Sequence, residues 1–322
     1  MAFYRLGSKG DEVRRIQEKL KSEGFYKGPI DGDFGGGTEA AVKAFQKKNG
    51  LSVDGIVGSI TWNALFREEI PDSSILDKLL DYKCLALTGS FETGKGIPEC
   101  FTGLSGDFDG QGMSLGVLQW NFGQESLQPL LRDMIDENPD TVESIFGTNY
   151  DILVEALNSD KEELMTFVRS IQHPVRHYIY EPWKGMFKSL GRIEEFQNIQ
   201  VKYARRLFES AVTFCAEYGL WSERAMALMF DIKVQNGSIS SLVKAQILSD
   251  FKDLSADLSE EEREVQKMRV VANRRAEASN PRWVEDVRAR KLCCANGEGR
   301  VHGITYELGG QFGIRLQQHG LG

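Results

Sequence analysis

The sequence has few of the residues that bind metal ions. It contains only four histidines among 322 residues. His173 and His177 are four residues apart, but Pro174 would break a helix that could bring them together, and there is no HExxH motif. A zinc amidase is therefore not expected, and these two histidines are interpreted as surface or capping residues. We expect no metal ion and no other cofactor.

Cysteine is also scarce, and its five positions do not form a metal-binding or disulfide pattern. Cys293 and Cys294 are adjacent, which suits neither an ordinary disulfide nor CxxC chemistry. We expect all five to be reduced and mostly packed in the protein interior, after synthesis in a reducing compartment. A cysteine peptidase would need a Cys at the start of a helix. Cys84 lies inside a predicted helix and Cys100 is not followed by one, so this class is not expected either.

Long hydrophobic runs are missing as well. No window of 18 apolar residues exists, so we expect nothing that spans a membrane. The N-terminus, MAFYRLGSKGDEV, has no apolar core of signal-peptide length, so we expect synthesis in the cytoplasm without such a peptide. Residues 1–66 hold ten Lys/Arg against eight Asp/Glu, a net charge of +2. Because the whole chain has a net charge of −8, the remainder carries about −10. That acidic balance argues against nucleic acid as a partner.

What the sequence does contain begins with an internal repeat in the first 66 residues. DGDFGGGTEAAVKAFQ (31–46) is echoed by DGIVGSITWNAL (54–65). In each copy Asp-Gly makes a turn, and Thr38 or Thr61 takes the position of a helix N-cap. Before the first copy, four apolar residues lie on one face of a helix that ends by Gly24: Val13, Ile16, Leu20 and Phe25. The pattern predicts three short helices with tight turns.

Residues 8–66 resemble the peptidoglycan-binding module of bacterial and phage wall hydrolases. The similarity includes both DG-x-x-G-x-x-T copies and the Ala-Phe-Gln helix. It implies that bacterial peptidoglycan is the partner and that wall peptide or glycan binds in the groove between the repeats. The alternative for each polar or glycine position is a role in the turn alone. The candidate wall-binding residues are Asp31, Phe34, Gln46 and Asp54.

The remainder is predicted to be mainly helical. We expect a first domain over 1–68, a linker over 69–75 and a second domain over 76–322. Ser259 with Glu262 three residues later forms a capping box, and the glycine-rich tail 295–322 is partly β-like. Overall the pattern predicts a mainly α (α+β) protein, with a short β/turn segment in its larger domain. Apolar periodicity predicts helices over 75–87, 125–137, 150–157, 160–171, 193–219, 222–234, 239–252, 259–279 and 283–292.

The stretch LTGSFETGKGIPECFTGLSGDFDGQGMSLGVLQW (87–120) carries candidate catalytic carboxylates. Glu92 ends an apolar run, and Asp107 and Asp109 lie in a glycine-rich segment. Glycosidases need one protonated and one ionised carboxyl flanking the scissile bond. A carboxyl at an apolar helix end is desolvated and stays protonated, whereas one in a solvated turn stays ionised. Ser114 could orient the attacking water, or could be a turn hydroxyl that caps the following residues.

This acidic segment also has two other interpretations. Asp107, Asp109 and Gln111 fall at alternating positions with Gly112 next, as in a calcium loop. An EF-hand would then require Glu at position 118, where this chain has Leu118. A purely structural acidic turn is the other alternative. The segment favours glycosidic chemistry.

SFE (90–92) followed by DGQGMSLGVLQW (109–120) resembles the lysozyme superfamily. It is most similar to glycoside hydrolase family 46, the chitosanases, in which Glu precedes an Asp-Gly-x-Gly-x-Thr-x-Gly turn. The resemblance implies a lysozyme-like fold, with Glu92 as acid, Asp109 as base and Ser114 in place of a water-positioning Thr. It also suggests that Asp231, in the segment 230–239, pairs with an Arg. The candidate substrate-binding residues are Asp107, Gln119, Asp231 and Asn236.

The departures from the chitosanase pattern are the Ser for Thr, the short loop containing Pro98, and the wall-binding module. They favour peptidoglycan over chitosan. We therefore expect a muramidase-type hydrolase that cleaves β-1,4 bonds of the wall glycan with inversion. The alternatives are a chitosanase, which the acidic charge suits, a lytic transglycosylase, or a non-catalytic wall-binding protein. A phage endolysin released through a holin and an effector delivered by a secretion system both fit, and the effector would have an immunity protein as partner.

Overall fold

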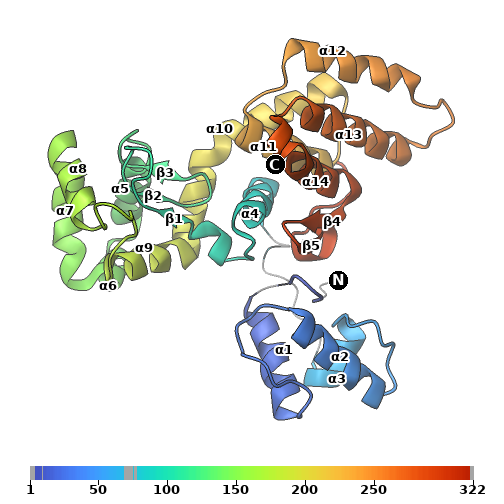
Figure 1. Cartoon of the computed structure of the whole chain (residues 1–322), viewed down its shortest axis with the longest axis horizontal. Coiled ribbons are helices and arrows are strands. Elements are labelled where there is room, and N and C mark those ends of the chain that lie inside the picture. The colour runs from blue at the N-terminus through green and yellow to red at the C-terminus, as the bar shows by residue number, and fades with distance from the viewer. Residues whose placement is uncertain (1–3, 9, 69–74, 76–77, 320–322) are drawn as a thin grey trace. The chain divides into compact units, whose positions relative to one another are not determined.

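The computed structural model describes residues 4–8, 10–68, 75 and 78–319. The chain divides into two compact units, residues 1–87 with 207–322 and residues 88–206. Helices dominate both, and the described strands form one sheet of three and one of two (Figure 1). The predicted mainly α class is confirmed. Residues 69–74 of the predicted linker lie outside the described residues, and the predicted domain limits stay a prediction.

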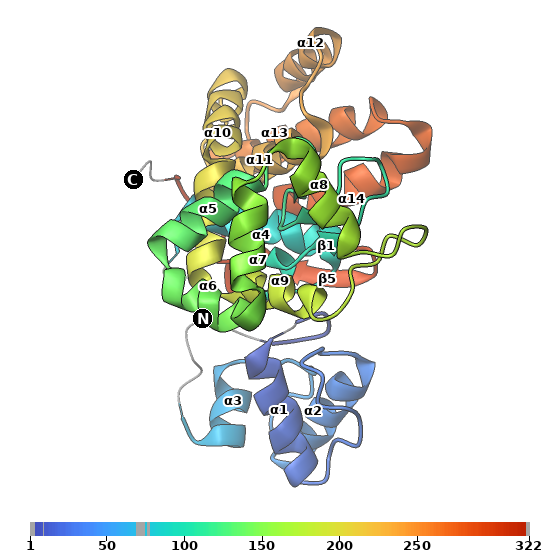
Figure 2. The ribbon, with the colours of Figure 1, turned by 90° about the vertical axis from the view of Figure 1, so that its left-hand side faces the viewer.

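The N-terminal region folds as three helices, α1 (Asp11–Ser22), α2 (Gly36–Lys48) and α3 (Ser59–Phe66) (Figure 2). The predicted apolar face of the first helix is confirmed for Val13, Ile16 and Leu20, which are fully buried. Phe25 lies beyond the end of the helix at Ser22 and is half-buried against the same core. The small core of this region includes Val13, Ile16, Leu20, Phe34, Val42, Phe45 and Trp62.

The side chain of a buried glutamine, Gln17, stabilises the first copy of the repeat through hydrogen bonds. Gln17 Nε2 donates to Asp31 Oδ1 (2.8 Å) and to Thr38 Oγ1 (3.2 Å). Its Oε1 accepts from the backbone N of Gly32 at 2.9 Å. One side chain thus ties a helix to the Asp-Gly turn and to the next helix.

Gln46 makes the same contacts in the second copy. Its Nε2 donates to Asp54 Oδ1 (2.8 Å) and Thr61 Oγ1 (3.2 Å), and its Oε1 accepts from Gly55 N (2.9 Å). Thr61 therefore does not cap its helix, and neither does its counterpart Thr38. Both helices begin earlier, after Gly35 and Gly58, so the predicted N-caps are wrong.

These contacts also decide where the candidate wall-binding residues lie. Phe34 and Gln46 are 2% and 1% exposed, which leaves little of either side chain for contact with the wall, and their role as wall contacts stays a prediction. A region of this size has few side chains available for a core, and these two are part of it. Asp31 and Asp54 remain exposed, although each also accepts hydrogen bonds that hold its own turn.

Residues 88–206 contain a small antiparallel sheet of order β1-β2-β3. Ser114 in β2 pairs with Ser105 in β1 and with Asn121 in β3. Apolar side chains from the sheet and the helices that follow form one core, including Met113, Leu115, Phe122, Leu130, Phe187 and Leu190. The strands are β1 (Leu104–Ser105), β2 (Ser114–Leu115) and β3 (Trp120–Asn121), after the 3-10 turn η1 (Glu99–Phe101).

The helices of this region are α5 (Gln128–Glu137), α6 (Pro139–Phe146), α7 (Tyr150–Asn158), α8 (Lys161–Ser170) and α9 (Trp183–Arg192), with the turn η2 (Gly147–Asn149). The sequence did not predict α6 or α9. Glycine at 185 and 191 lowers helix propensity in α9. Burial of Trp183, Phe187 and Leu190 outweighs that cost.

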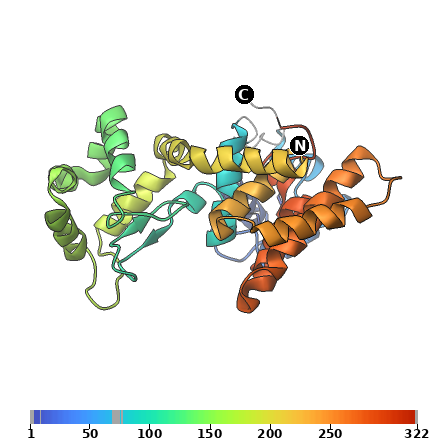
Figure 3. The same ribbon diagram turned by 90° about the horizontal axis from the view of Figure 1, so that it is seen from above.

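The long helix α10 (Glu194–Tyr218) leads into a C-terminal helical group. There α14 packs against α11 and α13, which Figure 3 shows from above. The capping box of Ser259 and Glu262 is confirmed, as is β structure in the tail. The elements are α11 (Glu223–Asn236), α12 (Ser241–Asp250), η3 (Phe251–Asp253), α13 (Glu260–Glu277), η4 (Pro281–Trp283), α14 (Val284–Asn296), β4 (Glu298–Val301), β5 (Ile304–Glu307) and α15 (Leu308–Gln311).

Candidate active site

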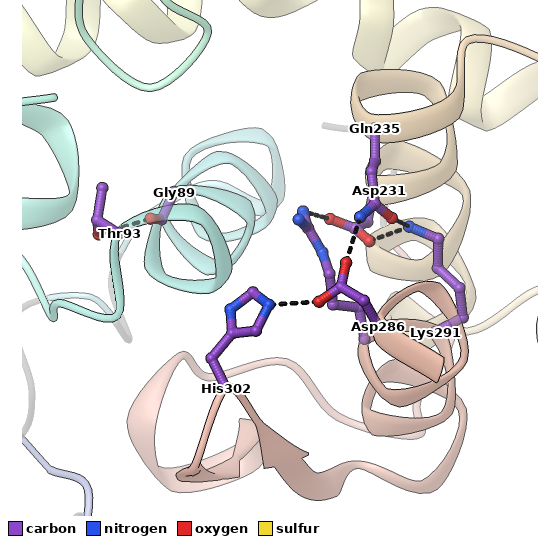
Figure 4. A network of polar contacts seen from close by, with 8 residues as sticks. Gly89, Thr93, Asp231, Gln235, Asp286, Lys291 and His302 are labelled. Carbon is purple, nitrogen blue, oxygen red and sulfur yellow. Dashed lines mark hydrogen bonds and ion pairs between the residues drawn. The ribbon is translucent and has the colours of Figure 1, made fainter. Parts of the chain in front are cut away.

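Glu92 lies in the last turn of α4 (Leu80–Thr93). The helix continues past the predicted end at Leu87 because Phe91 buries another turn, and it stops at Gly94, whose φ is 65°. Thr93 Oγ1 donates to the carbonyl of Gly89 at 2.8 Å in this last turn (Figure 4).

The face of α4 that carries Glu92 can be placed from its neighbour Gly89. A Cβ added at Gly89 would lie 3.1 Å from the carbonyl oxygen of Cys100 and from the Val117 side chain. Val117 belongs to the turn between β2 and β3. Residues three apart in a helix share a side, so Glu92 lies on the side of α4 that faces this turn.

Glu92 is exposed, so the predicted desolvation at an apolar helix end is wrong. Phe91 supplies the buried contact at this end of the helix and is 0% exposed. Adjacent helical residues point about 100° apart, so a buried position does not bury the next one.

Asp107 holds the loop between β1 and β2. Its side chain is half-buried, and Oδ1 accepts from the backbone N of Gly112 at 2.9 Å. Its own backbone N donates to Gln172 Oε1 at 2.9 Å. These contacts show a turn-forming role for Asp107, while its predicted contact with substrate stays a prediction.

Asp109, two residues further, is exposed at the tip of the same loop. Its Oδ1 accepts a local hydrogen bond from the backbone N of Gln111 at 3.1 Å. Gly110 beside it has a φ of 82°, which lets the loop reverse without strain. The loop therefore presents the carboxylate of Asp109 to solvent.

Ser114 begins strand β2, at the end of the sheet from which the acidic loop emerges. Its alternative interpretation as a turn cap is wrong, since it pairs within the sheet. A strand rises about 3.3 Å per residue, so a two-residue strand separates its two ends by roughly 7 Å. Glu92 faces the turn at one end of this sheet, and Asp109 lies in the loop at the other.

Gln119 stabilises the turn between β2 and β3. It has a φ of 54°, its Oε1 accepts from Ser105 Oγ (2.7 Å), and its Nε2 donates to the carbonyl of Gly116 (2.8 Å). Gln200 of α10 fixes the same turn, because its Oε1 accepts from Val117 N at 3.0 Å. Gln119 is exposed, and its role as a substrate contact stays a prediction.

The sequence did not identify the segment 171–180, which packs on the acidic loop. Gly106 fits so closely that an added Cβ would lie 1.6 Å from the carbonyl oxygen of His177. His173 Nδ1 accepts from two backbone N–H groups of its own loop (3.1 and 3.0 Å), which confirms its predicted capping role. The ring of Phe108, 72% exposed, lies 5.2 Å from that of His177. The acidic loop thus carries an exposed aromatic side chain, that of Phe108, directly before Asp109.

Asp231 lies in the other unit, on α11. Its two oxygens accept from Arg290 Nη2 (2.6 Å) and from Lys291 Nζ, and Lys291 also donates to Gln235 Oε1 (2.7 Å; Figure 4). The predicted pairing with an Arg is confirmed. Asp231 is 0% exposed, so it has no free surface in this conformation, and its role as a substrate contact stays a prediction. Burial would raise the pKa of Asp231, but the two cations outweigh it and lower that pKa to about 2.

Asn236 is the last residue of α11, and its role as a substrate contact stays a prediction. Its Oδ1 is buried and has no hydrogen-bond partner among the residues that the structure describes. The oxygen is therefore enclosed by protein in this conformation.

Other chemistries find little support in the described part of the chain. It contains no group of three or more His, Cys, Asp or Glu residues arranged to hold a metal ion. The five cysteines are buried free thiols, and burial raises the pKa of Cys100 to about 12, which opposes thiolate formation. No helix among the described residues has the length and apolarity needed to cross a bilayer.

Comparison with known proteins identifies the N-terminal region. Residues 9–65 match the family model described as "Putative peptidoglycan binding domain", which confirms the predicted module. A spore cortex-lytic enzyme of Bacillus cereus is 43% identical over 72 residues, 22% of this chain and 28% of that enzyme. The N-acetylmuramoyl-L-alanine amidase CwlM of Mycobacterium tuberculosis is 38% identical over 76 residues, 20% of this chain and 19% of that enzyme. This chain thus covers less than a third of either relative.

Solved structures similar to the chain include chitosanases. A native chitosanase from Bacillus subtilis MY002 has a TM-score of 0.40 and 16% identity, covering 72% of this chain and 97% of that one. A family 46 chitosanase from Gynuella sunshinyii has a TM-score of 0.38 and 12% identity, covering 68% and 86%. These scores are too low to transfer the role of any residue.

Proposed function

We propose that this protein is a cell-wall hydrolase that cleaves the β-1,4-linked amino-sugar chain of peptidoglycan as a muramidase. The proposal assigns Glu92 as general acid, Asp109 as general base and Ser114 as the residue that positions water. The observation that carries it is the placement of two exposed carboxylates about one short sheet. Glu92 faces the β2–β3 turn, and Asp109 is at the tip of the β1–β2 loop.

In the proposed reaction, a glycan bound between the two carboxyls excludes water from Glu92 and so favours its protonated form. Glu92 gives its proton to the glycosidic oxygen as the bond to the anomeric carbon breaks. Asp109 removes a proton from a water that attacks the same carbon from the opposite side. The products are two shorter glycans, with the anomeric configuration inverted at the new reducing end. No cofactor takes part in these steps.

The choice of the bacterial wall as substrate rests on the module. The relatives that share it are named as a cortex-lytic enzyme and an amidase, which indicates that the module accompanies different catalytic domains. Tethering would keep the catalytic unit at the surface of an insoluble polymer and raise its effective concentration there. The enzyme would reach the wall as an endolysin through a holin, or as an effector through a secretion system, in which case an immunity protein would be its partner.

A chitosanase is the second candidate, favoured by the charge of residues 88–206. This segment holds 18 Asp/Glu against 11 Lys/Arg, a balance that suits a cationic sugar chain. Sacculi and chitosan offered to the same enzyme separate the two candidates. Release of fragments from chitosan alone would replace the first proposal with the second.

The two acidic-loop residues provide the test of the assigned base. We expect Asp109→Asn to lower kcat on sacculi by at least about a hundredfold, since a general base typically contributes ~10²–10⁴-fold. Asp107→Asn should stay within about tenfold of wild type, because the Asn oxygen can still accept from Gly112 and keep the loop. Fragment release under saturating substrate measures both. A larger loss in the Asp107 variant than in the Asp109 variant would show that the wrong carboxylate has been assigned.

A further inference from the structure

Three cations follow one another along α9 at four-residue intervals. Lys184, Lys188 and Arg192, hereafter the α9 cation row, therefore lie on one side of the helix. Helix α9 lies beside β1 and the turn η1 (Figure 1). Like charges at this spacing destabilise a helix, so the row is unfavourable for the helix by itself.

The C-terminal end of α9 is held against the segment that follows Glu92. Gly191 packs on that segment so closely that an added Cβ would lie 2.9 Å from the carbonyl oxygen of Phe101. Arg192 forms a two-point ion pair with Glu99, with Nε and Nη2 at 2.5 and 3.3 Å from the two carboxylate oxygens. The row is thereby fixed next to the loop 94–98, which joins Glu92 to η1.

Lys95, three residues after Glu92, adds a fourth positive charge here. Lys95 lies in the loop 94–98, beside which the contacts of Gly191 and Arg192 hold the end of α9. Burial lowers the pKa of Lys188, and the charges of Lys95 and Lys184 lower it further. Among the described residues, neither Lys95 nor Lys188 has a carboxylate within 4.0 Å. Lys184 reaches Glu181 only at 3.9 Å and both are largely exposed. A local excess of positive charge thus sits in a segment that is acidic as a whole.

We propose that the α9 cation row, with Lys95, binds the carboxylates of the stem peptides that hang from peptidoglycan glycan. The inference rests on the proposed function and specifies its substrate. The N-acetylated sugars of the wall are neutral, so a cation cluster gains nothing from the glycan itself. The stem peptides carry free carboxylates along the chain. Chitosan would be repelled by the same cluster, so the row would select peptidoglycan.

The test compares one peptide-bearing glycan with its peptide carboxylates free and with them blocked. The full-length enzyme is assayed on soluble wall glycan that carries stem peptides and on the same glycan after carbodiimide coupling has converted its peptide carboxylates to neutral methylamides. We expect wild type to have a higher kcat/KM on the glycan with free carboxylates. In the double variant Lys184→Gln/Lys188→Gln, the ratio of the two kcat/KM values should fall about tenfold, mostly through KM, and 1 M NaCl should shrink the difference because salt screens exposed charges.

Lys161→Gln is the matched control. Lys161 is an exposed lysine of the same unit, but it is the first residue of α8, is not part of the α9 cation row, and pairs with Glu125 (3.2 Å). Its ratio should equal that of wild type. An unchanged ratio in the double variant, with an unchanged thermal transition, would overturn the proposal. If wild type cuts neither glycan, the proposed function fails, and calorimetric titration with a soluble stem peptide still tests the row. Equal affinities of wild type and the double variant for that peptide would overturn it independently.

Discussion

Replacing Glu92 by Gln should abolish lysis of sacculi while leaving the protein folded and able to bind them. The substitution keeps the shape of the side chain but removes the proton that, in the proposed mechanism, Glu92 gives to the leaving oxygen. Loss of a general acid typically costs ~10²–10⁴-fold in kcat. Binding should survive, because residues 9–65 form the wall-binding module with a core of their own. Fragment release, sacculus pull-down and a thermal melt measure the three properties.

Glu99→Gln is the control for this prediction, since Glu99 is the next carboxylate along the chain. The Arg192 guanidinium, bonded to its side chain, holds the pKa of Glu99 below its usual range. Glu99 therefore stays ionised and is poorly suited to donate a proton. We expect kcat of this variant within about tenfold of wild type. If the Glu92 variant retained more activity than the Glu99 variant, the acid would have to be reassigned.

The second large effect is expected in stability, from Asp231→Asn. Arg290 and Lys291 are 1% and 0% exposed, and both contact the Asp231 carboxylate. Removing one member of a buried ion pair leaves an uncompensated charge and costs about 3–5 kcal/mol. At roughly 2–4 °C per kcal/mol for domains of 150–250 residues, the melting temperature should fall by about 10 °C. Calorimetry of the full chain measures it.

Asp250→Asn provides the comparison for an exposed pair. Asp250 binds Arg274 through two contacts, of 2.6 and 2.9 Å, but both side chains are about one-third exposed. Such surface pairs contribute about 0–1 kcal/mol, so its melting temperature should barely change. Equal losses in the two variants would contradict the account of the buried network.

Asp231 also sets a pH dependence. Its folded pKa of about 2 lies below the usual value of 3.8, so the ionised form is favoured in the folded protein. The stabilisation is therefore complete above about pH 4 and is lost as pH falls from there through about pH 2. The stability difference between wild type and Asp231→Asn should narrow over that same range.

Local patterns in the sequence predicted much of the helical framework. Three short-range signals appear in the structure as the sequence predicts. They are the DG-x-x-G-x-x-T repeat, the helical spacing of apolar residues at 13, 16 and 20, and the Ser259 capping box. The sequence did not predict helix α9, because Gly185 and Gly191 lower the helix propensity of this segment. Only its burial in the core, a long-range effect, explains why it forms.

The candidate site shows the same limit. A carboxyl in a glycine-rich loop was recognisable at Asp109, because the loop is local. The exposure of Glu92 depends on which side of α4 packs against Val117, and the sequence between them does not reveal it. The partners of Asp231 lie 59 and 60 residues away. Only the folded structure shows that these partners are Arg290 and Lys291.

In the proposed mechanism two carboxylates direct a water to the anomeric carbon, and the mass of the cut glycan end tests this most directly. A lytic transglycosylase would use a hydroxyl of the substrate itself and leave a 1,6-anhydro end, one water lighter. Sacculi digested with the full-length enzyme and analysed by mass spectrometry should yield ordinary reducing ends. Predominantly anhydro ends would contradict the account and reduce Asp109 to a residue that shapes its loop.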